Sequence, residues 1–177
     1  MDRYWFLTWT TYGTWLPGDE RGFVSNVRDG DGPEVKHAES GMPYDAKQRG
    51  LVEAARERMM GNPIWIQAVH AEELAEQFRE TARFRQYAIS AGAIMANHVH
   101  LVVGVPGDPQ PDTLLRDFKS YGSRCLNKLA GKPESGTWWT AGGSRRKLRD
   151  EDAVRSVVEY VRNQQKPLVV WIGEPAV

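Results

Sequence analysis

The sequence has a single cysteine, Cys125, so it can form no intrachain disulfide and suits a reducing compartment. It has no run of about eighteen apolar residues, the length that a membrane-spanning helix needs. No basic segment followed by an apolar one comes after Met1, so we expect neither a secretory signal nor a membrane anchor. These absences favour a cytoplasmic protein and exclude a disulfide-rich secreted domain.

The chain also has no net charge, because its basic and acidic residues are equal in number. The whole chain therefore gives no electrostatic reason to expect a nucleic-acid partner. The distribution is uneven, however. The segment from Arg116 to Arg149 holds nine basic and two acidic residues, a local excess of seven positive charges. Such a segment fits phosphate binding, and a solvated helix face gives the same count.

The chain of 177 residues is 41% hydrophobic, which is enough for one core and predicts a single domain over residues 1–177. A stretch rich in Gly, Pro and Asp, at about residues 13–44, predicts a long surface excursion. The hydrophobic patterns indicate strands interrupted by helices, and the short join at Ala96 makes two of the strands antiparallel, so the fold class is α+β. The expected strands are Tyr4–Thr11, Ile64–Gln67, Gln86–Met95, Asn97–Val105 and Leu168–Ile172, and the expected helices are Asp45–Met60, Ala71–Arg83, Asp112–Leu129 and one from Asp150 to before Pro167.

Two histidines stand two residues apart on one of these strands. Side chains alternate along a strand, so His98 and His100 share one face, while Val99 and Leu101 point to the other. Two imidazoles on one face are spaced to bind a single divalent cation or a phosphate. The alternative is two partly buried histidines with ordinary hydrogen bonds.

The last helix carries a second pair of polar side chains beside an apolar stripe. At about 100° per residue, Tyr160 and Gln164 fall on one flank of the stripe, one turn apart. Helix spacing alone also allows a boundary tyrosine and a surface glutamine. The stripe itself predicts burial of Val154, Val157, Val158 and Val161.

Together these motifs resemble the single-strand DNA transposases of the HUH class that have one catalytic tyrosine, the IS200-like and REP-associated tyrosine transposases. The resemblance covers about Ala88–Trp171, with Tyr4–Thr11 as the matching first strand. Its specific part is the His-Val-His triplet followed by Tyr160 and Gln164 at this distance. The motifs that carry it are Met95–His100, Lys119–Tyr121, Asn127, Trp139–Gly142 and Tyr160–Gln164.

The resemblance implies a ferredoxin-like antiparallel sheet with helices packed on it. It implies that His98, His100 and Gln164 bind a divalent metal, Mg²⁺ or Mn²⁺, and that Tyr160 is the nucleophile. The activity implied is nicking and joining of hairpin-bearing single-stranded DNA through a 5′-phosphotyrosine, in the cytoplasm at the nucleoid, with a homodimer left open. The expected DNA contacts are Lys119, Arg124, Arg145, Arg146 and Lys147.

Four alternatives accompany this interpretation. A histidine-triad nucleotide hydrolase would need a third histidine where this chain has Val102. A domesticated relative could bind hairpin DNA without cutting it. Tyr121 is a second candidate nucleophile, although its spacing with Phe118 and Cys125 predicts that it faces the core. Finally, Trp138 and Trp139 could either stack on bases or lie in the core.

Overall fold

An antiparallel sheet forms the centre of the computed structural model, which describes residues 1–19, 26–27, 35–36 and 49–173. Within these residues the sheet has five strands in the order β6-β1-β5-β4-β7, and every neighbouring pair is antiparallel. The strands are β1 (Arg3–Thr10), β4 (Ala88–Ile94), β5 (His98–Val105), β6 (Ser144–Leu148) and β7 (Val169–Ile172). The α+β class, the antiparallel sheet and the central place of the histidine strand beside the first strand are confirmed.

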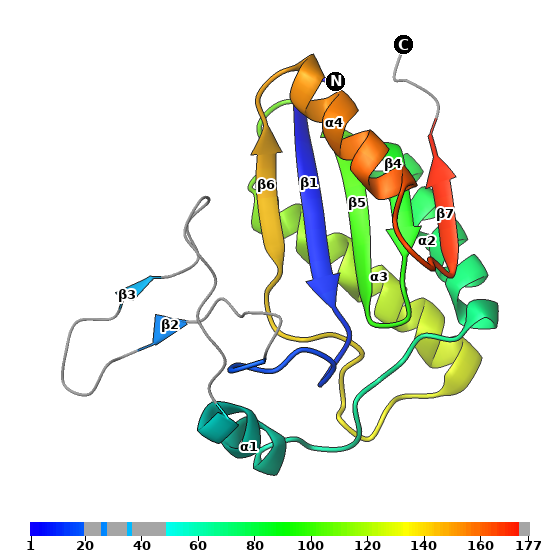
Figure 1. Cartoon of the computed structure of the whole chain (residues 1–177). Helices are drawn as coiled ribbons and strands as arrows, with labels where there is room; N and C mark the ends of the chain where they lie inside the picture. Colours follow the sequence, from blue (N-terminus) through cyan, green and yellow to red (C-terminus); the bar gives the residue numbers. More distant parts are fainter. Residues whose placement is uncertain (20–25, 28–34, 37–48, 174–177) are drawn as a thin grey trace.

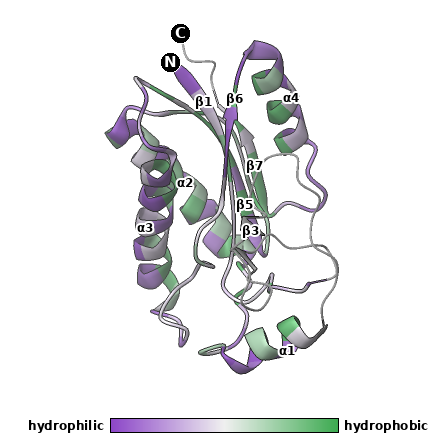
Figure 2. Ribbon diagram, turned by 90° about the vertical axis from the view of Figure 1, so that its left-hand side faces the viewer, coloured by the Kyte–Doolittle hydropathy of each residue, from purple (hydrophilic) through white to green (hydrophobic). Residues whose placement is uncertain are grey.

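Helices cover both faces of this sheet (Figures 1 and 2). Helices α2 (Ala68–Arg85) and α3 (Pro111–Ala130) pack on one face, which we call the α2–α3 face. Helix α4 (Glu151–Arg162) packs on the other, the α4 face. Helix α1 (Arg49–Glu57) lies beyond one end of the sheet. A separate pair joins β2 (Asn26–Val27) to β3 (Val35–Lys36).

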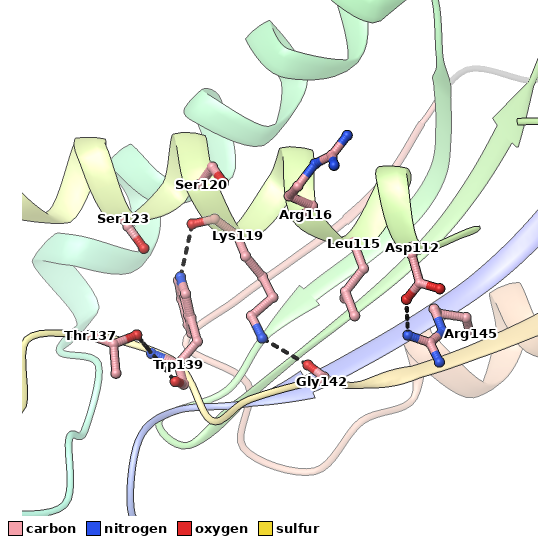
Figure 3. A pocket seen from close by; sticks show the side chains of 10 residues that line it. All are labelled: Asp112, Leu115, Arg116, Lys119, Ser120, Ser123, Thr137, Trp139, Gly142 and Arg145. Carbon is pink, nitrogen blue, oxygen red and sulfur yellow. Dashed lines mark hydrogen bonds and ion pairs between the residues drawn. The ribbon is translucent and has the colours of Figure 1, made fainter. Parts of the chain in front are cut away.

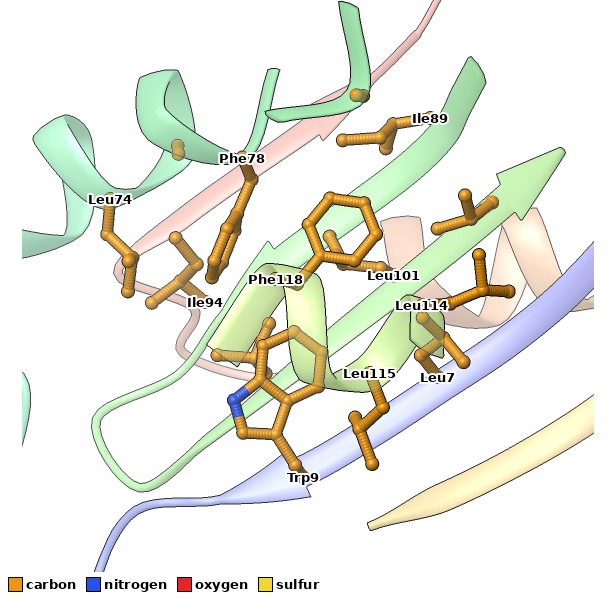
Figure 4. Packing of buried hydrophobic residues seen from close by; sticks show 14 of the residues in the cluster. Leu7, Trp9, Leu74, Phe78, Ile89, Ile94, Leu101, Leu114, Leu115 and Phe118 are labelled. Atoms are coloured by element: carbon orange, nitrogen blue, oxygen red, sulfur yellow. The ribbon is translucent and has the colours of Figure 1, made fainter. Parts of the chain in front are cut away.

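The larger core fills the space between the sheet and helices α2 and α3 (Figure 4). Alternation along β1 and β5 sends Leu7, Trp9 and Leu101 into it, and all three are almost fully buried. The rings of Trp9 and Phe78 meet edge to face at 5.6 Å, and those of Phe78 and Phe118 at 5.7 Å. These aromatic contacts fix helices α2 and α3 against the central strands.

A smaller core lies between α4 and the sheet. Val157 and Val161 are buried there against Val102 of β5, and the small side chains of Ala91 and Ala93 let the helix approach β4. The apolar stripe of α4 is therefore buried at its centre, while Val154 and Val158 are partly buried at its margin. Asp150 caps the helix, because its side chain accepts a hydrogen bond of 2.8 Å from the main-chain nitrogen of Ala153.

One predicted strand is wrong, and one observed strand was not predicted. The segment 64–67 forms no strand, although the main-chain nitrogens of Ile64 and Ile66 donate single hydrogen bonds to Tyr12 and Ala96. Conversely, β6 was missed, because its residues are charged and mostly exposed and show no alternation of apolar side chains. Most of the expected 13–44 excursion and the expected helix start at Asp45 lie outside the described residues.

The predicted buried face of α3 is also partly wrong. Tyr121 and Cys125 are only half-buried, and Leu129 is 45% exposed. The buried positions beyond Phe118 are instead Gly122 and Leu126. Helix α3 is thus rotated about its axis relative to the prediction. Gly122 permits this orientation, because a Cβ there would approach Leu74 and Phe78 of α2 to 3.0 Å.

Gly92 offers a test of how tightly the sheet packs. The Trp171 ring of β7 lies where a Cβ on Gly92 would be, and the Arg79 guanidinium covers that ring at 5.0 Å. Gly92→Ala should therefore displace Trp171 and lower the free energy of unfolding by about 1–3 kcal/mol. Gly50→Ala is the control, since no atom lies within 4 Å of its Cβ position in α1. It should be neutral or slightly stabilising. Urea unfolding measures both, and an equal effect of the two variants would contradict the packing described.

Candidate active site

The two histidines of β5 lie together on the α4 face. Their ring centroids are 4.7 Å apart, with the ring planes at 78°. The intervening Val99 is fully buried on the α2–α3 face, and the next residue, Leu101, is buried there too. The shared face predicted from strand alternation is therefore present.

Hydrogen bonds with neighbouring side chains orient both imidazoles. The Thr8 hydroxyl of β1 lies 2.8 Å from Nδ1 of His100, its cross-strand partner. Nδ1 of His98 lies 2.7 Å from Oδ1 of Asn97, so this nitrogen donates and carries the hydrogen. In both rings the hydrogen bond engages Nδ1, and Nε2 is the nitrogen that a cation would use.

His100 is only 5% exposed. Burial, together with the nearby positive charge of a protonated His98, lowers the pKa of His100 to about 3. The ring is therefore neutral at neutral pH. Neutral imidazole is the form that binds metals.

Tyr160 of α4 lies over this part of the sheet and is 53% exposed. Its ring meets the His100 ring at 5.6 Å and the Phe6 ring at 6.0 Å, both edge to face. Phe6 also stacks on His100 at 5.4 Å. The structure thus places the candidate nucleophile next to one candidate ligand, with Phe6 between strand and helix supporting both.

Gln164 lies beyond the end of α4, one turn after Tyr160. Its Nε2 donates a hydrogen bond of 3.1 Å to the main-chain oxygen of Tyr160, so the amide is engaged with the helix end. No group of three His, Cys, Asp or Glu side chains that could hold a metal occurs in the described residues. The two predicted histidine ligands are therefore adjacent, and metal binding by His98, His100 and Gln164 remains a prediction.

The basic residues of β6 divide between the two faces of the sheet. Arg146 pairs with Phe6 across the strands, and its guanidinium lies 5.4 Å from the Phe6 ring, on the α4 face. Arg145 instead pairs with Asp112 of α3, and Lys147 lies over the Trp5 ring of the larger core at 5.9 Å. Strand alternation therefore directs Arg146 toward the face that carries the histidines, and Arg145 and Lys147 toward the other face.

The other two expected DNA contacts lie on α3. Lys119 donates hydrogen bonds of 2.7 Å to the main-chain oxygens of Thr140 and Gly142, beside a pocket of about 380 Å³ (Figure 3). It therefore ties the loop before β6 to the helix. The Arg124 guanidinium lies 5.1 Å from the Tyr121 ring, on the same helix. Contact of either residue with DNA remains a prediction.

The paired tryptophans belong to the core rather than to a DNA surface. Trp138 and Trp139 are 7% and 4% exposed. Their indole nitrogens donate to Oδ1 of Asn127 at 2.8 Å and to the main-chain oxygen of Lys119 at 3.0 Å. The base-stacking alternative is wrong, because neither ring is accessible.

Residues 62–164 match the family described as transposase IS200 like, which is more than half of the chain. The chain belongs to the IS200-like transposase family. The matched range contains the histidine pair, Tyr160 and Gln164. A comparison with curated protein sequences finds no match.

Two solved structures are similar to this family member. The first is a REP-associated tyrosine transposase bound to a REP hairpin, with a TM-score of 0.50 and 14% identity over 89% of this chain and 63% of that one. The present chain thus spans less than two thirds of that relative. The second, a candidate transposase from Deinococcus radiodurans R1, has a TM-score of 0.49 and 15% identity over 93% and 92% of the two chains. The first likeness supports the fold. No helix in the described part of the chain is both long and apolar enough to cross a membrane.

Sequence reasoning did not identify Thr8 and Phe6 as neighbours of the histidines. It also did not place Arg146 on a different face of the sheet from Arg145 and Lys147. The first two could have been found, because Trp5, Leu7 and Trp9 predict the buried face of β1 and leave the alternate residues on the other face. Arg146 could not be placed until β6 was known to be a strand.

Lys119 provides a prediction on pH. Burial, and then the charge of Arg145, lower the pKa of Lys119 from 10.5 to about 8. Between about pH 8 and pH 10.5 the Lys119 amine binds more protons in the unfolded chain than in the folded one. The contribution of Lys119 to the free energy of unfolding therefore rises with pH over this range. A neutral amine keeps two N–H donors for its two carbonyl partners. Urea unfolding from pH 7 to 10 should show the wild type gaining stability relative to Lys119→Met. A constant difference between them would contradict the shift.

Proposed function

We propose that this protein is a transposase that cuts and rejoins single-stranded DNA through a covalent bond between Tyr160 and a 5′ phosphate, with a divalent metal held at the histidine pair. One observation carries the proposal. Tyr160, at the exposed edge of α4, contacts the ring of His100, which is neutral, buried and oriented by Thr8. This adjacency supports the proposal, because the reaction needs a nucleophile beside a metal-binding pair.

The residues present fit a divalent metal. His98 and His100 each have Nδ1 engaged by a neighbouring oxygen, the second-shell arrangement that fixes a ligating imidazole. The Gln164 oxygen would supply a third donor from the end of α4. Mixed nitrogen and oxygen ligands suit Mn²⁺, and also Mg²⁺ where it is more abundant. When bound, the metal would polarise the phosphate and neutralise its developing charge.

The chain's own residues would perform the transfer. The phenol oxygen of Tyr160 attacks the phosphorus and loses its proton, the bond from phosphorus to the 3′ oxygen breaks, and that oxygen leaves as a protonated 3′ hydroxyl. The DNA 5′ phosphate remains joined to Tyr160 as an ester. Attack by a 3′ hydroxyl reverses the step and rejoins DNA without an external energy source. Edge contacts with Phe6 and His100 limit the directions in which the phenol can point.

The proposed substrate is single-stranded DNA that contains a hairpin. Support comes from family membership and from the similar REP-associated transposase, which was solved with a REP hairpin. Basic side chains on both faces of the sheet, Arg146 on one and Lys119 and Arg145 on the other, would contact phosphates of such a folded strand.

A second candidate is a hairpin-binding protein that does not cut. The hydrogen bond of Gln164 favours it, because the amide is engaged with the main-chain oxygen of Tyr160 at the helix end. The two candidates differ in whether a covalent adduct forms.

Tyr160→Phe tests the nucleophile. The change removes one oxygen and keeps the ring contacts with Phe6 and His100, so fold and DNA binding should persist while the covalent adduct is abolished. The measurement is a denaturing gel of the protein with labelled hairpin-bearing single-stranded DNA and Mn²⁺ or Mg²⁺.

Tyr121→Phe is the matched control, because Tyr121 lies on α3, on the opposite side of the sheet from the histidine pair. It should form the adduct as the wild type does. An adduct that persists in Tyr160→Phe and disappears in Tyr121→Phe would move the nucleophile to α3. DNA binding without any adduct in the wild type would favour the second candidate.

Metal binding can be tested without DNA. His98→Ala should lower Mn²⁺ affinity by at least about 10-fold, and Thr8→Val, which removes the hydrogen bond to His100, by about 10-fold. His70→Ala is the control, since His70 lies on α2 of the other face. Electron paramagnetic resonance of free Mn²⁺ reports the affinity. Equal affinities in His98→Ala and His70→Ala would rule out the histidine pair as the site.

A further inference from the structure

Three consecutive basic residues of β6 differ in the surroundings of their charges. Arg145 pairs with Asp112, and Lys147 lies 4.0 Å from Asp108. Arg146, between them, points to the other face of the sheet, where no carboxylate pairs with it among the described residues. Arg146 is exposed, and its guanidinium lies over the face of Phe6, its one ring partner in the described part of the chain. A positive charge in this setting is available to an anionic ligand.

The position of Arg146 relative to the candidate active site is fixed by Phe6. Arg146 and Phe6 are cross-strand partners, and the guanidinium lies 5.4 Å from the ring. The same ring stacks on His100 at 5.4 Å and meets Tyr160 at 6.0 Å. Phe6 is thus flanked by the cation, the candidate nucleophile and a candidate metal ligand, all on the α4 face.

We propose that Arg146 is a phosphate-binding residue of the active site, which holds a non-bridging oxygen of the phosphodiester that Tyr160 attacks. This inference rests on the proposed function and adds a third group to it. It also separates Arg146 from Arg145 and Lys147, whose positions on the α2–α3 face allow them only to hold DNA away from the reacting atoms.

The chemistry of the step favours a guanidinium here. As the phenol oxygen attacks, negative charge grows on the non-bridging oxygens of the phosphate. A planar guanidinium can donate two parallel hydrogen bonds to such oxygens, which an ammonium cannot do. The cation–π contact with Phe6 orients the group before DNA arrives and reduces the side-chain freedom lost on binding.

The test is a comparison of Arg146→Gln with Arg145→Gln, which removes the same charge one residue away on the other face. The single-turnover rate of adduct formation at saturating DNA and the affinity for DNA are measured separately. Arg146→Gln should lower the saturating rate about 100-fold, as the loss of one transition-state donor does. Arg145→Gln should act mainly on the affinity. Arg155→Gln, an exposed change on α4 paired only with Asp152, controls for net charge and should change neither quantity.

Two further measurements exclude a purely structural role for Arg146. Arg146→Lys should recover only part of the rate, because one point charge replaces a two-pronged donor. Replacing a non-bridging oxygen of the scissile phosphate with sulfur should slow the wild type by a factor that is reduced in Arg146→Gln. The free energies of unfolding of Arg146→Gln and Arg146→Lys in urea should match that of the wild type.

The outcomes separate the inference from the function on which it rests. If the wild type forms the adduct and Arg146→Gln forms it at the same saturating rate, Arg146 has no role in the reaction and the inference is overturned while the proposed function stands. If the rate falls equally in Arg145→Gln, the effect is general electrostatics and the inference is again overturned. If the wild type forms no adduct, both fail together.

Discussion

The burial of Val99, Leu101 and Val103 beneath helices α2 and α3 sets the direction of every side chain on β5. A slip of one residue would drive both imidazoles into a core of aliphatic and aromatic side chains and would move Val99, Leu101 and Val103 to the α4 face. The hydrophobic effect thereby holds His98 and His100 on the α4 face, without any contribution from the polar groups themselves. The hydrogen bond between Thr8 and Nδ1 of His100 then needs only to set the rotation of a ring whose position is already fixed.

Helix α4 joins the other half of the site to this strand. Its buried valines pack on small side chains of β4, so the helix lies close to the sheet and its flanking Tyr160 reaches the ring of His100. The site therefore lies on the α4 face, at the margin of the smaller core, on a strand whose other face packs in the larger core. Phe6 belongs to the margin of the second core and touches the candidate nucleophile, a candidate ligand and Arg146.

Periodicity was enough to predict the elements that have an apolar face. Strands β1, β5 and β7 and helices α2 and α3 follow their expected ranges closely, while α4 ends at Arg162 instead of continuing up to Pro167. The adjacency of Tyr160 and His100 was implied by the family resemblance. The features that were missed share one cause, which is that their determinants are not hydrophobic, whereas the strand expected at 64–67 is an apolar segment that makes only single main-chain hydrogen bonds. Strand β6 is held by main-chain pairing to β1 and exposes its charges. The rotation of α3 depends on Gly122, which has no side chain to contribute to a pattern. The orientation of the Gln164 amide is a local choice between acceptors that spacing does not encode.

The order of the site's parts along the chain has a consequence for its synthesis. Phe6, Thr8 and the histidine pair come early, and α3 and β6 intervene before Tyr160. On a ribosome, β1, β4 and β5 can pair and orient both imidazoles while the phenol has not yet been made. A chain interrupted before α4 would have both histidines but not Tyr160. The capacity to break DNA that we propose for this centre would thus be acquired only after α4 has been made.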